Sequence, residues 1–114
     1  MNDCIFCKIA AGEIPSEFLY EDDDLFAIKD ISPQAPVHIL IISKEHIPSI
    51  LNITNNEAHL ISKIHLLATH LATRYKLDED GFRIVNNCRK AGGQAVPHLH
   101  FHLLGGRQMQ WPPG

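Results

Sequence analysis

The chain has 114 residues, 45% of them hydrophobic, and its formal net charge at pH 7 is −3. This length allows one domain with a modest core, so we expect a single domain over residues 1–114. The scattered Lys and Arg residues form no basic stripe, which argues against nucleic acid as a partner. No apolar run approaches the roughly 20 residues of a membrane span, and the N-terminal segment does not resemble a secretion signal. We therefore expect a cytoplasmic protein with no membrane partner and, because the number of cysteines is odd, no disulfide framework.

The first part of the chain predicts a short helix and three strands. Apolar residues recur with helical spacing over residues 5–9, and a glycine and a proline follow this segment. Two short strands are expected over residues 18–21 and 25–30, joined by an acidic turn. The segment VHILIIS, residues 37–43, is β-branched and apolar on both faces, which is typical of a central strand.

The second part predicts one long helix followed by two strands. Residues 54–57, TNNE, fit a capping box, and a helix is expected over residues 55–76. Strands are expected over residues 81–87 and 98–104, separated by a loop that contains two glycines. The order of these elements predicts an α+β domain whose five strands form an antiparallel meander.

The last predicted strand carries His98, His100 and His102 at every second position. Residues at this spacing point to one face of a strand, about 6.5–7 Å apart per step, so we expect three imidazoles on one face. A histidine-rich polar surface is one interpretation. A metal held by all three is a second, but bonds of about 2.0–2.1 Å cannot draw together outer residues whose backbones lie ~13 Å apart. Two of the three could still share an ion.

Phosphate chemistry is the third interpretation of these histidines. A neutral imidazole is a nucleophile toward phosphorus, and a second imidazole can donate a proton to phosphate oxygens or to a leaving group. The loop GGQA, residues 92–95, lies just upstream, where glycines allow backbone N–H groups to approach an anion. His38, at the start of the predicted central strand, could add a fourth imidazole, although a lone strand histidine is usually structural.

Several segments together resemble a known family. They are IFCKI, GEIP, DISPQAPVHILIISKEHI, GFRIVNN, GGQAVPHLHFHLLGGRQM and the final WPPG. These segments are similar to the histidine-triad (HIT) family, and in particular to its histidine-triad nucleotide-binding (Hint) branch. The resemblance extends over essentially the whole chain, and the ending GGRQMQWPPG separates this branch from the dinucleoside polyphosphate hydrolases.

The resemblance implies a HIT-like fold and an enzyme that hydrolyses purine nucleoside phosphoramidates. Adenosine 5′-phosphoramidate would give AMP and an amine by cleavage of the P–N bond, with no cofactor needed for catalysis. His100 would be the nucleophile and would carry the nucleotide in a covalent intermediate. His102 would contact the α-phosphate and stabilise its developing charge. The backbone carbonyl of His98 would fix the tautomer of His100, and His38 would continue this relay.

The resemblance also implies a purine nucleotide site. Asp30 would bind the ribose hydroxyls with its two carboxylate oxygens. The expected phosphate and leaving-group residues are Asn87, Gly93, Gln94 and Ala95. The expected apolar slot around the base consists of Ile5, Phe6, Ile9, Ile28 and Ile31. Without the resemblance, Asp30 fits a turn residue at a strand end, and the five apolar residues fit a core.

Two positions depart from the family pattern. Ala95 stands where many relatives carry Ser or Thr, which puts protonation of the departing amine in question and predicts slower turnover. Gln110 replaces a histidine that is common before WPPG. Trp111 would reach toward the partner subunit's site, so the resemblance implies a homodimer in which two sheets join into one.

Cys4 and Cys7 form a CxxC pair, which by itself is either half of a zinc site or two core thiols. Family members with this pair complete it with histidines that match His46 and His98 here. The resemblance therefore implies a closed Cys2His2 set that holds a structural zinc ion. One triad histidine would then bind the metal, leaving His100 and His102 for chemistry.

Two other functions stay open at this point. A nucleotide-binding or scaffold protein with weak or vestigial catalysis is suggested by Ala95. A dinucleoside polyphosphate hydrolase is the other candidate, and the ending of the chain argues against it.

Overall fold

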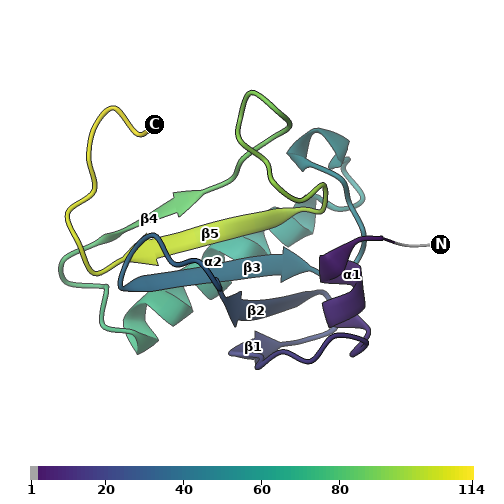
Figure 1. Ribbon diagram of the computed structural model, residues 1–114, viewed down its shortest axis with the longest axis horizontal. Coiled ribbons are helices and arrows are strands. Elements are labelled where there is room, and N and C mark those ends of the chain that lie inside the picture. Colours follow the sequence, from purple (N-terminus) through teal and green to yellow (C-terminus); the bar gives the residue numbers. More distant parts are fainter. Residues whose placement is uncertain (1–2) are drawn as a thin grey trace.

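The computed structural model describes residues 3–114, and Figure 1 shows how its elements are arranged. The helices are α1 (Ile5–Ala10), α2 (Ala58–Arg74) and the short 3-10 helix η1 (Ile50–Asn52). The strands are β1 (Tyr20–Glu21), β2 (Leu25–Lys29), β3 (Val37–Ser43), β4 (Phe82–Val85) and β5 (His100–Gly105). Among the described residues, no helix is long and apolar enough to cross a bilayer.

The five strands form one antiparallel sheet in the order β1-β2-β3-β5-β4. The antiparallel sheet with one long helix is confirmed, and β1 to β3 form the expected meander. The meander prediction is wrong for the last two strands, because β5 lies between β3 and β4. The burial of the strands explains this order. β5 is buried or half-buried along its whole length and takes a position inside the sheet, while β4, which is half-buried or exposed, forms an edge.

The sheet carries one helix on each face (Figure 1). On the face against α2, side chains of the helix and the strands form the larger core, which includes Leu25, Ile39 and Phe101. On the opposite face, α1 covers one end of the sheet. The smaller core beneath α1 consists of Phe6, Ile9, Phe26, Ile28, Leu40 and Ile42. Because α1 is short, it leaves much of this second face without a covering helix.

α2 begins three residues later than predicted. The Thr54 N–H donates to Glu57 Oε1 at 2.8 Å, and Thr54 Oγ1 accepts from the Asn56 N–H at 3.2 Å. The polar side chains thus form hydrogen bonds within a separate turn before the helix, which is a common alternative for Thr and Glu at such positions. The helix starts only after this turn, with Glu57 as its N-cap.

β5 also begins two residues later than predicted, at His100. The His98 N–H donates to the Val96 carbonyl at 2.8 Å, and the Leu99 N–H donates to the Ile47 carbonyl at 2.7 Å. His98 therefore lies outside the strand ladder, and the three histidines do not share one regular strand. This displacement frees His98 to contact residues beyond the sheet.

Candidate functional site

Three imidazoles lie side by side on two central strands, on the sheet face that carries α1. His38 is on β3, and His100 and His102 are on β5. In the strand register, His100 is opposite Ile42 and His102 is opposite Leu40, both of which belong to the core beneath α1. Paired residues point to the same face of a sheet, which places the imidazoles there. His38 and His100 are 8% and 6% exposed, and His102 is half-buried.

His100 has a defined proton position. Its Nδ1 lies 2.7 Å from the backbone carbonyl oxygen of His98. A carbonyl can only accept, so Nδ1 must carry the proton and donate it. The other ring nitrogen, Nε2, therefore keeps its lone pair in the neutral ring. The Asn86 side-chain amide donates to the His100 carbonyl at 3.0 Å and fixes the backbone on the other side.

A chain of hydrogen bonds fixes the tautomers of His38 and His102 in the same way. The Gln34 backbone N–H donates to His38 Nδ1 at 3.0 Å, so the proton of His38 is on Nε2. That Nε2 lies 2.9 Å from His102 Nδ1, which must accept. His102 therefore carries its own proton on Nε2. The result is one imidazole with a lone pair at Nε2, at His100, beside one with a donor at Nε2, at His102.

The protonation state of these rings follows from their burial. Burial lowers the pKa of His38, His98 and His100 below the usual value, and it lowers the pKa of His102 to about 4. Removal from water disfavours the charged form, and for His102 the neighbouring His100 and His38 add to this effect. All four rings are thus neutral at pH 7, which is the state a nucleophilic imidazole requires.

Cys4, Cys7, His46 and His98 come together although up to 94 residues separate them. From His98 Nδ1, the distances are 3.2 Å to Cys4 Sγ, 3.4 Å to Cys7 Sγ and 3.1 Å to His46 Nδ1. Zinc bonds of about 2.0–2.3 Å give tetrahedral edges of roughly 3.3–3.8 Å, so the set has the size of a tetrahedral site. His98 Nε2 donates to the Ser43 carbonyl at 2.6 Å, which leaves the Nδ1 lone pair for a metal. These residues fit the expected metal set.

In a second set, Asp30, His38 and His102, the possible ligand atoms also lie within 4.8 Å of one another. Asp30 Oδ2 lies 3.4 Å from His38 Nε2. Here the proton positions oppose metal binding. The Gln34 N–H occupies the His38 Nδ1 lone pair, so His38 could coordinate through Nε2 only as an imidazolate. The three residues are joined instead by the hydrogen bond between His38 and His102 and by the contact of Asp30 with His38.

The expected base slot is only partly enclosed. Phe6, Ile9 and Ile28 are buried in the core beneath α1. Ile5 is 45% exposed and Ile31 is 98% exposed. The structure thus brings three of these side chains together and leaves two at the surface.

The expected phosphate-side residues lie in the loop before β5. Gly93 is exposed and has a φ of +80°, a conformation that favours glycine. Gln94 is engaged within the protein: its amide donates to the Pro48 and Val96 carbonyls at 2.7 and 2.9 Å, and its oxygen accepts from the Arg89 N–H at 2.7 Å. The Gln94 side chain therefore ties the loop together. Ala95 is exposed and Asn87 is half-buried.

The C-terminal segment lies alongside β4. Arg83 Nη2 donates to the Gln110 carbonyl at 3.0 Å, and Trp111 is 81% exposed. Gln110 thus contacts β4 through its backbone, and its side chain is not needed for that contact. Trp111 therefore makes little contact with the rest of the described chain.

Sequence reasoning missed three residues that organise the site: Gln34, Asn86 and Ser43. Gln34 and Ser43 act through backbone atoms, so the identity of the side chain gives no signal. Asn86 acts through its side chain, but it precedes Asn87 in the sequence, and only the fold shows that Asn86 contacts the backbone of His100.

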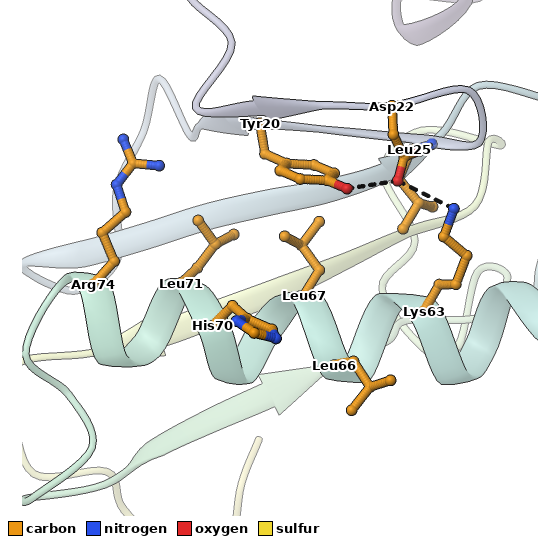
Figure 2. Close-up of a pocket in the computed structure, with 9 residues that line it drawn as sticks. All are labelled: Tyr20, Asp22, Leu25, Lys63, Leu66, Leu67, His70, Leu71 and Arg74. Atoms are coloured by element: carbon orange, nitrogen blue, oxygen red, sulfur yellow. Dashed lines mark hydrogen bonds and ion pairs between the residues drawn. The ribbon is translucent and has the colours of Figure 1, made fainter.

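A groove of about 510 Å³ lies on the other face of the sheet, between α2 and the β1–β2 hairpin (Figure 2). Leucine side chains, Leu67 and Leu71 among them, form its floor, and Lys63 pairs with Asp22 at 3.1 Å at one end. The imidazoles of His38, His100 and His102 point to the opposite face. This groove is therefore separate from the candidate site.

The comparisons with known proteins agree with this geometry. The HIT domain model matches residues 11–109. The chain belongs to the HIT family. It is 50% identical to a HIT family hydrolase from Legionella pneumophila Philadelphia 1, with a TM-score of 0.95 and coverage of 98% of this chain and 100% of that one. It is 48% identical to an uncharacterized HIT-like protein of Synechococcus elongatus over 113 residues, which covers 99% and 98% of the two chains.

A histidine triad nucleotide-binding protein from Candida albicans is a more distant HIT relative. It is 36% identical, with a TM-score of 0.81 and coverage of 96% of this chain and 83% of that one. The matched HIT segment includes His38, His100 and His102, but it begins after α1. Cys4 and Cys7 therefore lie outside the matched segment, while His46 and His98 lie inside it.

Proposed function

We propose that this HIT protein hydrolyses purine nucleoside phosphoramidates, giving a nucleoside monophosphate and an amine. Family membership, the similarity to a HIT family hydrolase and the similarity to a histidine triad nucleotide-binding protein support a nucleotide hydrolase. The tautomer of His100 is the main structural support for this proposal. Its Nδ1–H is held by the His98 carbonyl, so Nε2 presents a lone pair in a ring that is neutral at pH 7.

The reaction would proceed in two displacements at phosphorus. In the first, His100 Nε2 attacks the α-phosphorus, a new N–P bond forms, and the P–N bond to the leaving group breaks. The amine takes a proton from water, because Ala95 offers no hydroxyl at this position. In the second, water attacks the same phosphorus, the bond to His100 breaks, and the proton of the water passes to solvent. The Nε2–H of His102 would donate to the phosphate oxygens in both steps.

The rest of the nucleotide would lie over the uncovered part of the same sheet face. The Asp30 carboxylate would accept from the ribose hydroxyls, since it offers two oxygens and is only partly buried. The base would contact Ile28 and the rim formed by Ile5 and Ile31, while Phe6 and Ile9 would support it from below. Asn87 and the backbone of Gly93, Gln94 and Ala95 would border the phosphate and leaving group.

A homodimer is part of this proposal. β4 is the outer strand at one side of the sheet, and its residues are half-buried or exposed. An edge strand with unpaired backbone groups and partly apolar side chains is a template for pairing with a second copy. Antiparallel pairing of two β4 strands would join the sheets and bring the exposed Trp111 of one protomer close to the other.

We also propose that Cys4, Cys7, His46 and His98 bind a zinc ion. Two thiolates and two imidazoles are a typical set for structural zinc, and four protein ligands leave no position open for water. The ion would supply a fixed connection between these residues. It takes no part in the displacements at phosphorus.

The proposed function is tested by turnover of an adenosine 5′-phosphoramidate. We expect His100→Ala to lower kcat by at least 10³-fold while the nucleotide still binds, because the attacking group is lost. The matched control is His70→Ala, on the exposed side of α2, which should retain wild-type turnover. Full activity of His100→Ala would refute the assignment.

A second candidate function is a nucleotide-binding protein with vestigial catalysis, which the absence of a hydroxyl at Ala95 favours. Tight AMP binding by wild type without turnover of any phosphoramidate would support it. Faster hydrolysis of a diadenosine polyphosphate than of the phosphoramidate would instead assign the protein to dinucleoside polyphosphate hydrolysis. Ala95→Ser should raise phosphoramidate turnover if leaving-group protonation limits the rate.

A further inference from the structure

Building on the proposed hydrolysis at His100, we propose that the cluster Cys4/Cys7/His46/His98 and helix α1 position the nucleophile. The four residues of the metal set would then do more than hold the N-terminal segment against the sheet. When the set is filled, it fixes two residues that contact the His100 ring, which are His98 and Phe6. Both are positioning residues, because they act on the reaction only through His100.

The first connection runs through the backbone of His98. Three polar groups of His98 have separate partners. Its Nδ1 faces the two sulfurs and His46, and its Nε2 donates to the Ser43 carbonyl. Its backbone carbonyl accepts from His100 Nδ1. His98 is 0% exposed. A shift of the His98 ring therefore moves the peptide group that holds the His100 proton. The hydrogen bond of 2.7 Å that selects the reactive tautomer depends on that peptide group.

The second connection runs through Phe6. Its ring packs edge-on against His98, with centroids 5.8 Å apart, and against His100, with centroids 5.0 Å apart. Phe6 is 6% exposed and leaves His100 little room to rotate on that side. The two cysteines flank Phe6 along α1, so the residues that bind the ion also hold this ring in place.

α1 depends on the cluster for its position. The helix has six residues, and Cys4 is its N-cap, accepting from the Cys7 N–H at 3.4 Å. A helix this short is not stable alone and must be held by its contacts. The cluster joins it to His46, after β3, and to His98, before β5. Loss of the ion would remove the bonds that join α1 to these two histidines, whose ligand atoms lie 3.1–3.4 Å from the sulfurs and from each other, and we expect α1 to shift.

The experiment compares Cys7→Ser with Cys88→Ser, a cysteine variant outside the cluster. For each we would measure bound zinc, the AMP dissociation constant, kcat and KM, and the ring nitrogen shifts of His100 by NMR. We expect Cys7→Ser to lose zinc and about 10–100-fold in kcat, the range typical when groups that orient a site are removed. Its His100 signals should change from one tautomer to a mixture, while AMP affinity changes much less than kcat. Cys88→Ser should match wild type throughout.

Phe6→Leu separates the two connections and covers the case in which Cys7→Ser does not fold. It keeps all four ligands, so zinc should stay at one equivalent per chain while kcat falls, by less than in Cys7→Ser, and the His100 ring signals broaden. The proposal is overturned if a zinc-free Cys7→Ser protein, or Phe6→Leu, keeps the single His100 tautomer and the kcat of Cys88→Ser. A lower melting temperature with unchanged kcat would show that the cluster serves stability only.

The NMR measurement also separates this proposal from the proposed function. If wild type hydrolyses no phosphoramidate, the proposed reaction fails. The zinc-dependent tautomer of His100 can still be observed in that case. If wild type is active and its His100 tautomer does not depend on zinc, the positioning role fails while the reaction stands.

Discussion

At His100, one hydrogen bond determines which ring nitrogen keeps its lone pair and would attack phosphorus in the proposed reaction. The acceptor is a backbone carbonyl, which cannot donate, so the bond selects a single tautomer without a charged partner. The same logic starting from the Gln34 N–H gives His102 the opposite role, as a donor. Two chemically identical side chains therefore adopt different tautomers because of the backbone atoms around them.

Burial of the neutral imidazoles makes the stability of the fold sensitive to acid. His102 has a folded-state pKa of about 4, well below that of an exposed histidine, so the unfolded chain binds more protons between these values. Stability from this source is complete above about pH 6.5 and is lost as the pH falls toward 4. We expect His102→Gln to reduce the loss of unfolding free energy between pH 7.5 and 4.5 by on the order of 1–2 kcal/mol.

Urea denaturation at the two pH values measures this effect. The interval stays above the pH range in which Asp22 titrates, because hydrogen bonds and Lys63 hold the pKa of that carboxyl far below its usual range. An identical acid sensitivity in wild type and His102→Gln would show that His102 does not contribute.

At the scale of elements, the Gln94 side chain adds to the backbone hydrogen bonds that hold the loop before β5. Gln94 makes three hydrogen bonds to backbone groups, of which the one to Pro48 reaches the segment before η1. The loop borders the proposed phosphate site, so its order is required for that site. A glutamine that sequence reasoning assigned to ligand contact thus has an internal role as well.

Gln94→Ala should destabilise the protein by about 0.5–1.5 kcal/mol, because the Arg89 N–H and the Pro48 carbonyl lose a hydrogen bond at exposed positions. Hydrogen exchange of the Arg89 amide should become faster, and phosphoramidate KM should rise. The control is Gln108→Ala, whose amide makes a hydrogen bond only to the neighbouring Met109 carbonyl at an exposed position. Slow exchange at Arg89 in Gln94→Ala would mean that other contacts hold the loop.

At the scale of the whole molecule, the sheet order places β5 inside the sheet, next to the central β3, and β4 at an edge. This interior position gives the histidines a rigid base, with β3 on one side of β5 and β4 on the other. The edge position leaves β4 and the C-terminal segment available to a second copy. The arrangement of the histidines and the proposed homodimer thus both depend on the position of β5 between β3 and β4.

Substitution of Trp111 tests the proposed homodimer. With 81% of its surface exposed, Trp111→Ala should change the unfolding free energy of a protomer by no more than about 0.5 kcal/mol. If Trp111 contacts the partner subunit near its site, the substitution should raise KM several-fold and weaken the dimer in sedimentation experiments. Leu66→Ala, an exposed apolar residue on α2, is the control. A monomeric wild-type protein at micromolar concentration would contradict the assembly.

The sequence by itself determined the local features of this protein. The alternation of His100 and His102 on one strand, the apolar central strand and the long helix follow from periodicity, which depends only on neighbouring residues. The resemblance of its motifs also identified the HIT family and the Cys/His set. The observed first residues of α2 and β5 differ from the predicted ones by three and two positions, and these differences leave the features unchanged.

Only the tertiary structure decided the strand order, the displacement of His98 from the strand and the tautomers of the histidines. Strand order depends on which strand can be buried on both faces, and that is a property of the complete sheet. The tautomers depend on backbone atoms of Gln34 and His98, whose positions no side-chain pattern encodes. The contact between Cys4 and His98 joins residues 94 positions apart, and folding alone brings such residues together.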